Sequence, residues 1–367
     1  MRTTEGAAAG MPRAVGCAIA GLLLAVMPDY AASAEPRAAR GPVKVFLLAG
    51  QEGMSGYGVA GDLDKPAANQ KATLVRFMKD PKNVEKYAYL YTGKEKDKDG
   101  WTVRDDVFVT SGEWPHDGSK GQRYVIPRRH GRLAPGYGIY IPAWRGRRGR
   151  STPEERRFGP ELGIGHVLGN DLDETVLLVK LAYNTSSLAV DFRPPGSGGT
   201  VGPRYQAIVK GVRDAMAHLP ELVPGYDKAQ GYEIAGLFWN QGSYDMEYQH
   251  AIKYETNLAN LIGDLRRDLD APRMKVVVAT TGYGGWKQSP STHPVYGKVI
   301  EAQLAVPKRP EFRGNVVAVE TRDFHRDRAE FGGRDFAAAW WANGESHWLI
   351  GEAMGRAMLD LLKHAGQ

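Results

Sequence analysis

Cysteine is nearly absent from this sequence, and no other residue type forms a metal-binding pattern. Cys17 is the only cysteine among 367 residues, so the chain beyond it has no thiol for a disulfide, a thiolate nucleophile or a cysteine-based metal site. The nine histidines are scattered without the close spacing that zinc sites show. We therefore expect no metal and no disulfide.

Fingerprints of bound nucleotides are also missing. Residues 50–56, Gly-Gln-Glu-Gly-Met-Ser-Gly, lack the lysine of a phosphate loop and the glycine frame of a dinucleotide-binding turn. No nucleic-acid-binding module is recognisable in the chain. We expect neither a cofactor nor a nucleic-acid partner. The net charge of +6, with a pI near 9.1, would suit an acidic polysaccharide or simply a solvated surface.

The amino terminus has the composition of a secretory signal. Arg2 and Arg13 precede the apolar stretch Val15–Met27, which is too short to span a bilayer comfortably, and Ala32-Ser33-Ala34 offers small residues for signal peptidase. We predict that residues 1–34 are a cleavable signal peptide. The mature protein would then be secreted or periplasmic, without a stable membrane span. A retained amino-terminal anchor is the alternative.

Strand and helix patterns alternate over residues 43–362. Val43–Leu48 is a short run with β-branched and aromatic members, closed by Gly50, and predicts a buried central strand. Further strands are expected at 101–110, 174–182, 234–239, 275–281 and 315–320. Helices are expected from 158 onward and at 205–219, 254–269, 295–306 and 348–362. This alternation predicts an α/β fold: one three-layer, doubly wound domain of flavodoxin type with a parallel sheet and long loops.

Residues 122–157 are rich in Arg, Gly, Pro and aromatic residues, and we interpret them as a long basic loop insertion. Arginine matches carboxylate and sulfate groups, and Tyr137, Tyr140 and Trp144 have rings on which sugars can stack. A solvated surface loop without a partner is the simpler interpretation, because charge runs are usually solvated.

Four short blocks follow the predicted strands in order. The first strand runs into Gly50-Gln51-Glu52-Gly53-Met54, and the other blocks are Gly159-Pro160-Glu161, the loop 183–188, and the frame of Trp239, Gln241, Gly242 and Asp245. In this order they resemble the SGNH hydrolases and, within that superfamily, the sialate O-acetylesterase-like carbohydrate esterases of bacterial secreted type, which have Gly-Gln-Ser-Asn-Met in the first block. The resemblance implies a hydrolase domain over 43–362 and a carbohydrate partner, such as an acetylated or acidic glycan.

The same resemblance shows which catalytic positions are substituted. Glu52 occupies the place of the nucleophilic Ser, although an esterase of this type needs a hydroxyl that a base can deprotonate. Asn184 and Thr185 stand where the family has Gly-Gly, and Ala338 or Ala339 stands in place of the catalytic His. The resemblance thus implies a hydrolase fold with lost or strongly impaired ester hydrolysis. A carbohydrate-binding cleft would be retained, with ligand contacts from Gln51, Asn184, Gln241 and Asp245.

Two catalytic alternatives stay open at this point. The first is an active carbohydrate O-acetylesterase with a relocated nucleophile, Ser55, assisted by Asp323 and His325; against it, Ser is a common turn or cap residue, and a lone His is no triad. The second pairs Glu52 with Asp245 or Glu161 for glycoside cleavage, which requires carboxylates roughly 5 to 10 Å apart.

Overall fold

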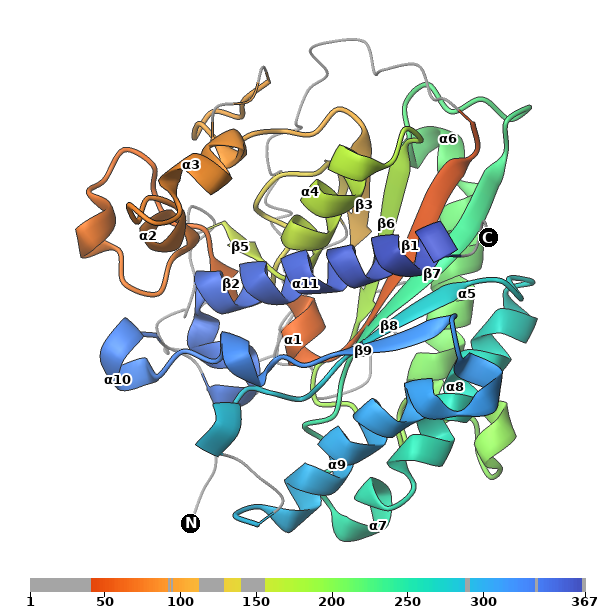
Figure 1. Ribbon diagram of the computed structural model, residues 1–367. Helices are drawn as coiled ribbons and strands as arrows, with labels where there is room; N and C mark the ends of the chain where they lie inside the picture. The colour runs from red at the N-terminus through yellow and green to blue at the C-terminus, as the bar shows by residue number, and fades with distance from the viewer. Residues whose placement is uncertain are drawn as a thin grey trace, which may run out of the picture. The chain divides into compact units, whose positions relative to one another are not determined.

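A seven-stranded sheet organises this computed structural model, which describes residues 41–91, 93, 95–111, 129–139, 156–287, 291–333 and 336–364. The strand order is β4-β3-β6-β1-β7-β8-β9 (Figure 1). β1 (Val43–Gly50) lies at the centre, as expected, and pairs in parallel with β6 (Val176–Ala182) and β7 (Tyr232–Asn240). The predicted signal peptide and most of the basic loop, 122–128 and 140–155, lie outside the described residues.

The sheet is parallel throughout except at one edge. β8 (Lys275–Ala279) and β9 (Val316–Val319) extend it in parallel beyond β7. On the other side β3 (Val107–Ser111) is parallel to β6, but β4 (Arg129–Arg132) runs antiparallel to β3. β4 belongs to the segment interpreted as loop, because an Arg-His-Gly-Arg edge strand has no apolar alternation that would indicate a strand. A separate two-stranded pair joins β2 (Gly58–Val59) and β5 (Arg157–Phe158).

Helices cover both faces of the sheet, which confirms the doubly wound α/β prediction. The long helices are α4 (Glu161–Asp171), α5 (Pro203–Ala217), α8 (Tyr254–Asp268), α9 (Pro294–Ala305) and α11 (Gly344–Lys363). Figure 1 shows α4 and α11 together on one face. The short helices are α1 (Glu52–Ser55), α2 (Leu74–Met78), α3 (Val84–Tyr87), α6 (Leu219–Leu222), α7 (Tyr248–Ala251) and α10 (Arg328–Phe331). Among the described residues no helix has the length and apolar character needed to cross a membrane.

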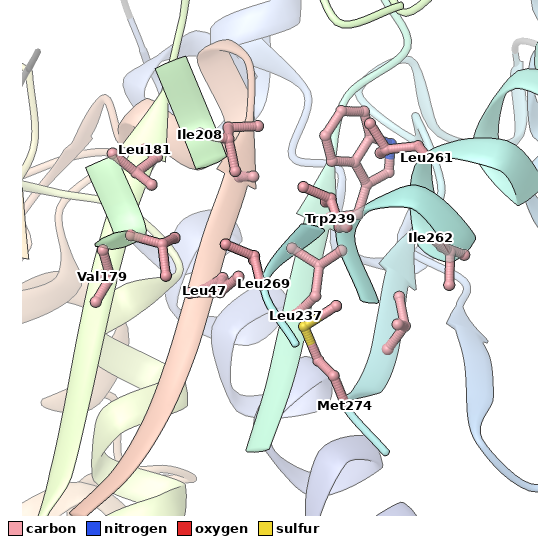
Figure 2. Packing of buried hydrophobic residues seen from close by; sticks show 14 of the residues in the cluster. Leu47, Val179, Leu181, Ile208, Leu237, Trp239, Leu261, Ile262, Leu269 and Met274 are labelled. Atoms are coloured by element: carbon pink, nitrogen blue, oxygen red, sulfur yellow. The ribbon is translucent and has the colours of Figure 1, made fainter. Parts of the chain in front are cut away.

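Alternate residues of β1 enter two separate cores, because successive side chains of a strand point to opposite faces. Val45 and Leu47 pack in the layer that contains α5, α8 and α9; Figure 2 shows Leu47 beside residues of β6, β7, α5 and α8. Phe46 and Leu48 pack in the layer with α4 and α11. Burial on both faces makes the strand apolar from Val45 to Ala49, which is why its sequence identified it as central.

A buried ion pair fixes α4 to β6. Lys180, in the middle of β6, is fully buried, and its Nζ donates to Glu161 Oε2 at 2.8 Å and to the Tyr137 carbonyl at 3.0 Å. The other oxygen of Glu161 accepts the Gly159 N–H at 2.8 Å. Burial lowers the pKa of Lys180. The two charges are tolerated in the core because each is paired and hydrogen-bonded.

We expect Lys180→Met to lower the free energy of unfolding by about 3–5 kcal/mol, because it leaves the Glu161 carboxylate buried without its cation. Urea denaturation measures this change. Lys210→Met is the matched control: Lys210 pairs with Asp214 on the exposed surface of α5, and its loss should change stability by no more than about 1 kcal/mol. Equal effects of the two variants would contradict the role assigned to the buried pair.

Candidate functional site

The candidate site lies where β1, β6 and β7 end. These ends are adjacent because the three strands are neighbours and parallel. A Cβ atom on Gly50 would lie 2.0 Å from the Asn240 carbonyl oxygen, and Gly50 has a φ of +145°. Only glycine allows the turn from β1 into α1 to pass this close to β7. In parallel α/β sheets this carboxyl edge is the usual place for ligands.

Glu52, the first residue of α1, is 1% exposed and is held by hydrogen bonds on both carboxylate oxygens. Oε1 accepts the backbone N–H of Thr185 at 2.8 Å, and Oε2 accepts Gln51 Nε2 at 3.0 Å. Burial raises the pKa of Glu52, although the hydrogen bonds from Thr185 and Ser243 oppose this shift. The carboxyl group is therefore a fixed part of the loop structure.

Thr185 has the backbone conformation of a glycine. Its φ is +54°, a rare value for a β-branched residue, and residues held in this region cost on the order of 1–3 kcal/mol. The loop therefore keeps a geometry suited to the Gly-Gly pair expected there. Its N–H is aimed at the place where Glu52 now lies.

Gln51 joins the loop after β1 to the loop after β7. Its Oε1 accepts the backbone N–H of Gly242 at 2.8 Å and the Ser243 hydroxyl at 3.2 Å, while its Nε2 donates to Glu52. All hydrogen-bonding atoms of this amide are thus used within the protein. The prediction that Gln51 binds a ligand remains a prediction, and the structure places the residue in the lining of the cleft described below.

Asp245 and Gln241 join the loop after β6 to the loop after β7. The Asp245 carboxylate is fully buried and accepts the N–H groups of Leu188 and Ala189 at 2.7 and 2.8 Å and Gln241 Nε2 at 2.6 Å. Burial raises the pKa of Asp245, against the effect of these hydrogen bonds. Gln241 also donates to the Ser186 carbonyl. Asp245, predicted as a ligand contact, is surrounded by protein donors.

A small cleft of about 10 Å³ lies against Gln51 and Gly53, the residues on either side of Glu52, and has room for about one water molecule. Ala338 and Trp340 are part of its wall, and the other lining residues are Gln51, Gly53, Asn240, Gln241, Gly242, Ser243, Thr281 and Tyr283. Trp340 and the two residues after it have left-handed φ values of 54° to 56°. An alanine, rather than an imidazole, faces the cleft at the position where the family resemblance placed the base.

Asn240 is the residue of this cleft that sequence reasoning missed. It is the last residue of β7, and its side chain is almost fully buried. Its Nδ2 has no hydrogen-bond partner in the described part of the chain. A buried donor without a partner is costly, so an acceptor that reached Nδ2 would be stabilising. The signal in the sequence was its position directly before Gln241-Gly242.

Ser55, Asp323 and His325 are not joined by hydrogen bonds. The buried Ser55 hydroxyl donates to Asn184 Oδ1 at 2.6 Å, and Asn184 Nδ2 donates to the Tyr57 hydroxyl at 2.9 Å. Asp323 Oδ1 accepts the indole N–H of Trp286 at 2.6 Å. The half-buried His325 ring packs near Trp340, with ring centroids 6.5 Å apart, and burial lowers its pKa. The relocated triad thus remains a prediction that none of these contacts supports.

The carboxylates proposed for glycoside cleavage also have structural partners. Glu161 is paired with Lys180, and Asp245 is held by three donors.

His347, in α11, is buried beside Phe158, with ring centroids 6.5 Å apart, and burial lowers its pKa to about 3. It is therefore neutral at ordinary pH.

The fold and this edge cleft define an SGNH hydrolase-like domain. The carbohydrate esterase family described as sialic acid-specific acetylesterases matches residues 147–333, and the chain belongs to this family. A probable carbohydrate esterase of Arabidopsis thaliana is 30% identical over 149 residues, 39% of this chain and 49% of that protein. The chain thus spans about half the length of the curated relative it matches.

Solved structures agree on the fold. The X-ray structure of the Arabidopsis thaliana protein has a TM-score of 0.50 at 19% identity, covering 87% of this chain and 98% of that one. The crystal structure of NanS has a TM-score of 0.52 at 13% identity, covering 89% of this chain and 99% of that one. Both likenesses extend well beyond the segment matched by the family.

Glu52→Gln tests the buried carboxyl group through pH. The folded-state pKa of Glu52 lies above its ordinary 4.5. The protonated Glu52 therefore makes its full contribution to the free energy of unfolding below pH 4.5, and this contribution is lost as the pH rises through the folded-state pKa. Gln cannot ionise and removes this dependence. We expect the unfolding free energy of the variant, relative to wild type, to be higher near neutral pH than near pH 4.5. An equal difference at both pH values, measured by urea denaturation, would contradict a raised pKa.

Proposed function

We propose that this protein is a secreted, carbohydrate-binding member of its family in which ester hydrolysis is lost or severely reduced. The observation that carries the proposal is the contact between Glu52 and the Thr185 N–H. In a Ser esterase of this fold, a hydroxyl is needed at the first position and a backbone donor for the oxyanion at the second. Here the Glu52 carboxylate occupies the position of the hydroxyl, and it accepts the Thr185 N–H that would otherwise serve as the oxyanion donor.

Two further features support this reading. Ala338 lines the cleft, and none of the described residues that line it is a His, Asp or Glu that could act as a general base. The absence of one triad member alone lowers rates by several orders of magnitude. A buried carboxylate would also repel the negative charge that develops on an acyl oxygen. The geometry favours a binding role over turnover.

Retained carbohydrate binding is supported by family membership and by the unpartnered Asn240 amide in the cleft. The proposed ligand is a glycan that carries acetyl or acidic groups. Secretion is part of the proposal on the strength of residues 1–34, whose basic start, apolar stretch and Ala-Ser-Ala end are typical of a signal peptide.

Hydrolysis can be tested with p-nitrophenyl acetate and O-acetylated sialyllactose. We expect the wild-type protein to stay close to the uncatalysed rate, and Ser55→Ala and Glu52→Ser to stay there too. The double variant Glu52→Ser with Ala338→His places a hydroxyl and an imidazole at the cleft. We expect its rate of hydrolysis to exceed the rates of Ser55→Ala and Glu52→Ser. Wild-type turnover that Ser55→Ala abolishes would reject the proposal in favour of an active esterase with Ser55 as nucleophile.

Binding can be tested by calorimetric titration with O-acetylated sialyllactose and with acetylated xylo-oligosaccharides. We expect wild-type protein to bind at least one of them, and Asn240→Ala to weaken that binding by about 1 kcal/mol, the worth of one hydrogen bond. Asn260→Ala is the matched control, because Asn260 lies on α8 and bonds Ser197. Absence of binding to every probe would refute the proposal.

A further inference from the structure

Trp286 is the most exposed large hydrophobic side chain of the described residues, at 58%. It lies in the short turn η5 (Gly285–Lys287), which follows β8. A single exposed hydrophobic residue needs no explanation by itself. Trp286 differs because its ring is fixed on two sides by polar contacts while it stays in solvent.

The indole ring is held along its edge and on one face. Its Nε1 donates to Asp323 Oδ1 at 2.6 Å, which fixes the ring's orientation. The Arg322 guanidinium carbon lies 3.8 Å from the ring centroid, so a cation covers one face. Both partners belong to η8 (Arg322–Phe324), the turn after β9.

Arg322 is itself rigidly placed. Its Nε and Nη2 donate to the two carboxylate oxygens of Glu320 at 2.9 and 2.7 Å, and Glu320 Oε1 also accepts the Thr280 hydroxyl at 3.1 Å. Carboxylate, guanidinium and indole thus form a stack anchored on the ends of two paired strands, β8 and β9 (Figure 1). The indole is ordered before any ligand arrives, which lowers the entropy lost on binding.

The same turn reaches the candidate cleft. Tyr283 lines the cleft; burial raises its pKa, and the nearby charge of Glu52 adds to this shift. Trp286 follows three residues later, so the two Cα atoms are at most about 11 Å apart. Gly285, with a φ of +60° and His325 3.2 Å from a Cβ built there, allows the tight turn between them.

We propose that Trp286 is a second sugar-binding position, on whose outer face one pyranose ring of an oligosaccharide stacks while a neighbouring unit of the same chain lies over the mouth of the cleft. This inference rests on the proposed carbohydrate binding and specifies it: the ligand is an oligosaccharide rather than a monosaccharide. The C–H groups on one face of a pyranose carry partial positive charge, and the indole face is negative. Asp323, beside the ring edge, is an acceptor for sugar hydroxyl groups.

The test compares two probes on the full-length protein: O-acetylated sialyllactose, a trisaccharide, and O-acetylated N-acetylneuraminic acid, a monosaccharide. We expect Trp286→Ala to weaken binding of the trisaccharide by about tenfold and to leave binding of the monosaccharide unchanged. Trp286→Phe keeps a ring and should retain more affinity than Trp286→Ala. Tyr232→Ala is the control, since Tyr232 is 45% exposed at the opposite, amino-terminal end of β7.

The outcomes separate this inference from the proposed function. Trisaccharide binding that is equal in wild type and Trp286→Ala overturns the Trp286 assignment and leaves carbohydrate binding intact. Equal losses for trisaccharide and monosaccharide also overturn it, because they indicate a general disturbance of the cleft. The proposed function and this inference are refuted together if the wild-type protein binds neither of these two probes nor the acetylated xylo-oligosaccharides.

Discussion

A buried polar network between three loops is the constraint on which the site depends. Asp245 accepts hydrogen bonds from backbone N–H groups of the loop after β6 and from the Gln241 side chain. The Gln51 side chain accepts hydrogen bonds from Gly242 and Ser243, in the loop after β7. Each of these groups would be costly to bury alone, and together they satisfy one another. The loops are therefore held in one arrangement, in which the Glu52 side chain points toward the Thr185 amide.

This rigidity explains how the fold accommodates a buried carboxyl group at residue 52. The glycine-like φ of Thr185 and the closeness of Gly50 to Asn240 belong to the loop geometry and do not depend on the chemistry of residue 52. Glu52 fills the position with an acceptor that the surrounding N–H groups can satisfy. Backbone and side-chain N–H donors at this edge of the sheet thus hold a resident carboxyl group.

Much of the fold could be predicted because burial leaves a local pattern. β1, β6 and β7 are apolar on both faces, and α5 and α8 carry apolar residues at helical spacing, so each was found within a few residues of its bounds. β4 was missed because an exposed edge strand of Arg, His and Gly has no such pattern. For the site, the sequence indicated which loops meet, but hydrogen-bond partners such as Asn184 for Ser55 lie more than a hundred residues apart and depend on tertiary packing.

The sequence by itself determined the α/β class, the family blocks and the residue types at the catalytic positions, because these are properties of short segments. Only the tertiary structure decided what those residues do. It places Ser55 against an amide, Asp323 against an indole and Asp245 among backbone donors, and it leaves the Asn240 amide unpaired in the cleft. The physical reason is that the role of a polar side chain is set by its partners, and packing brings those partners from distant strands.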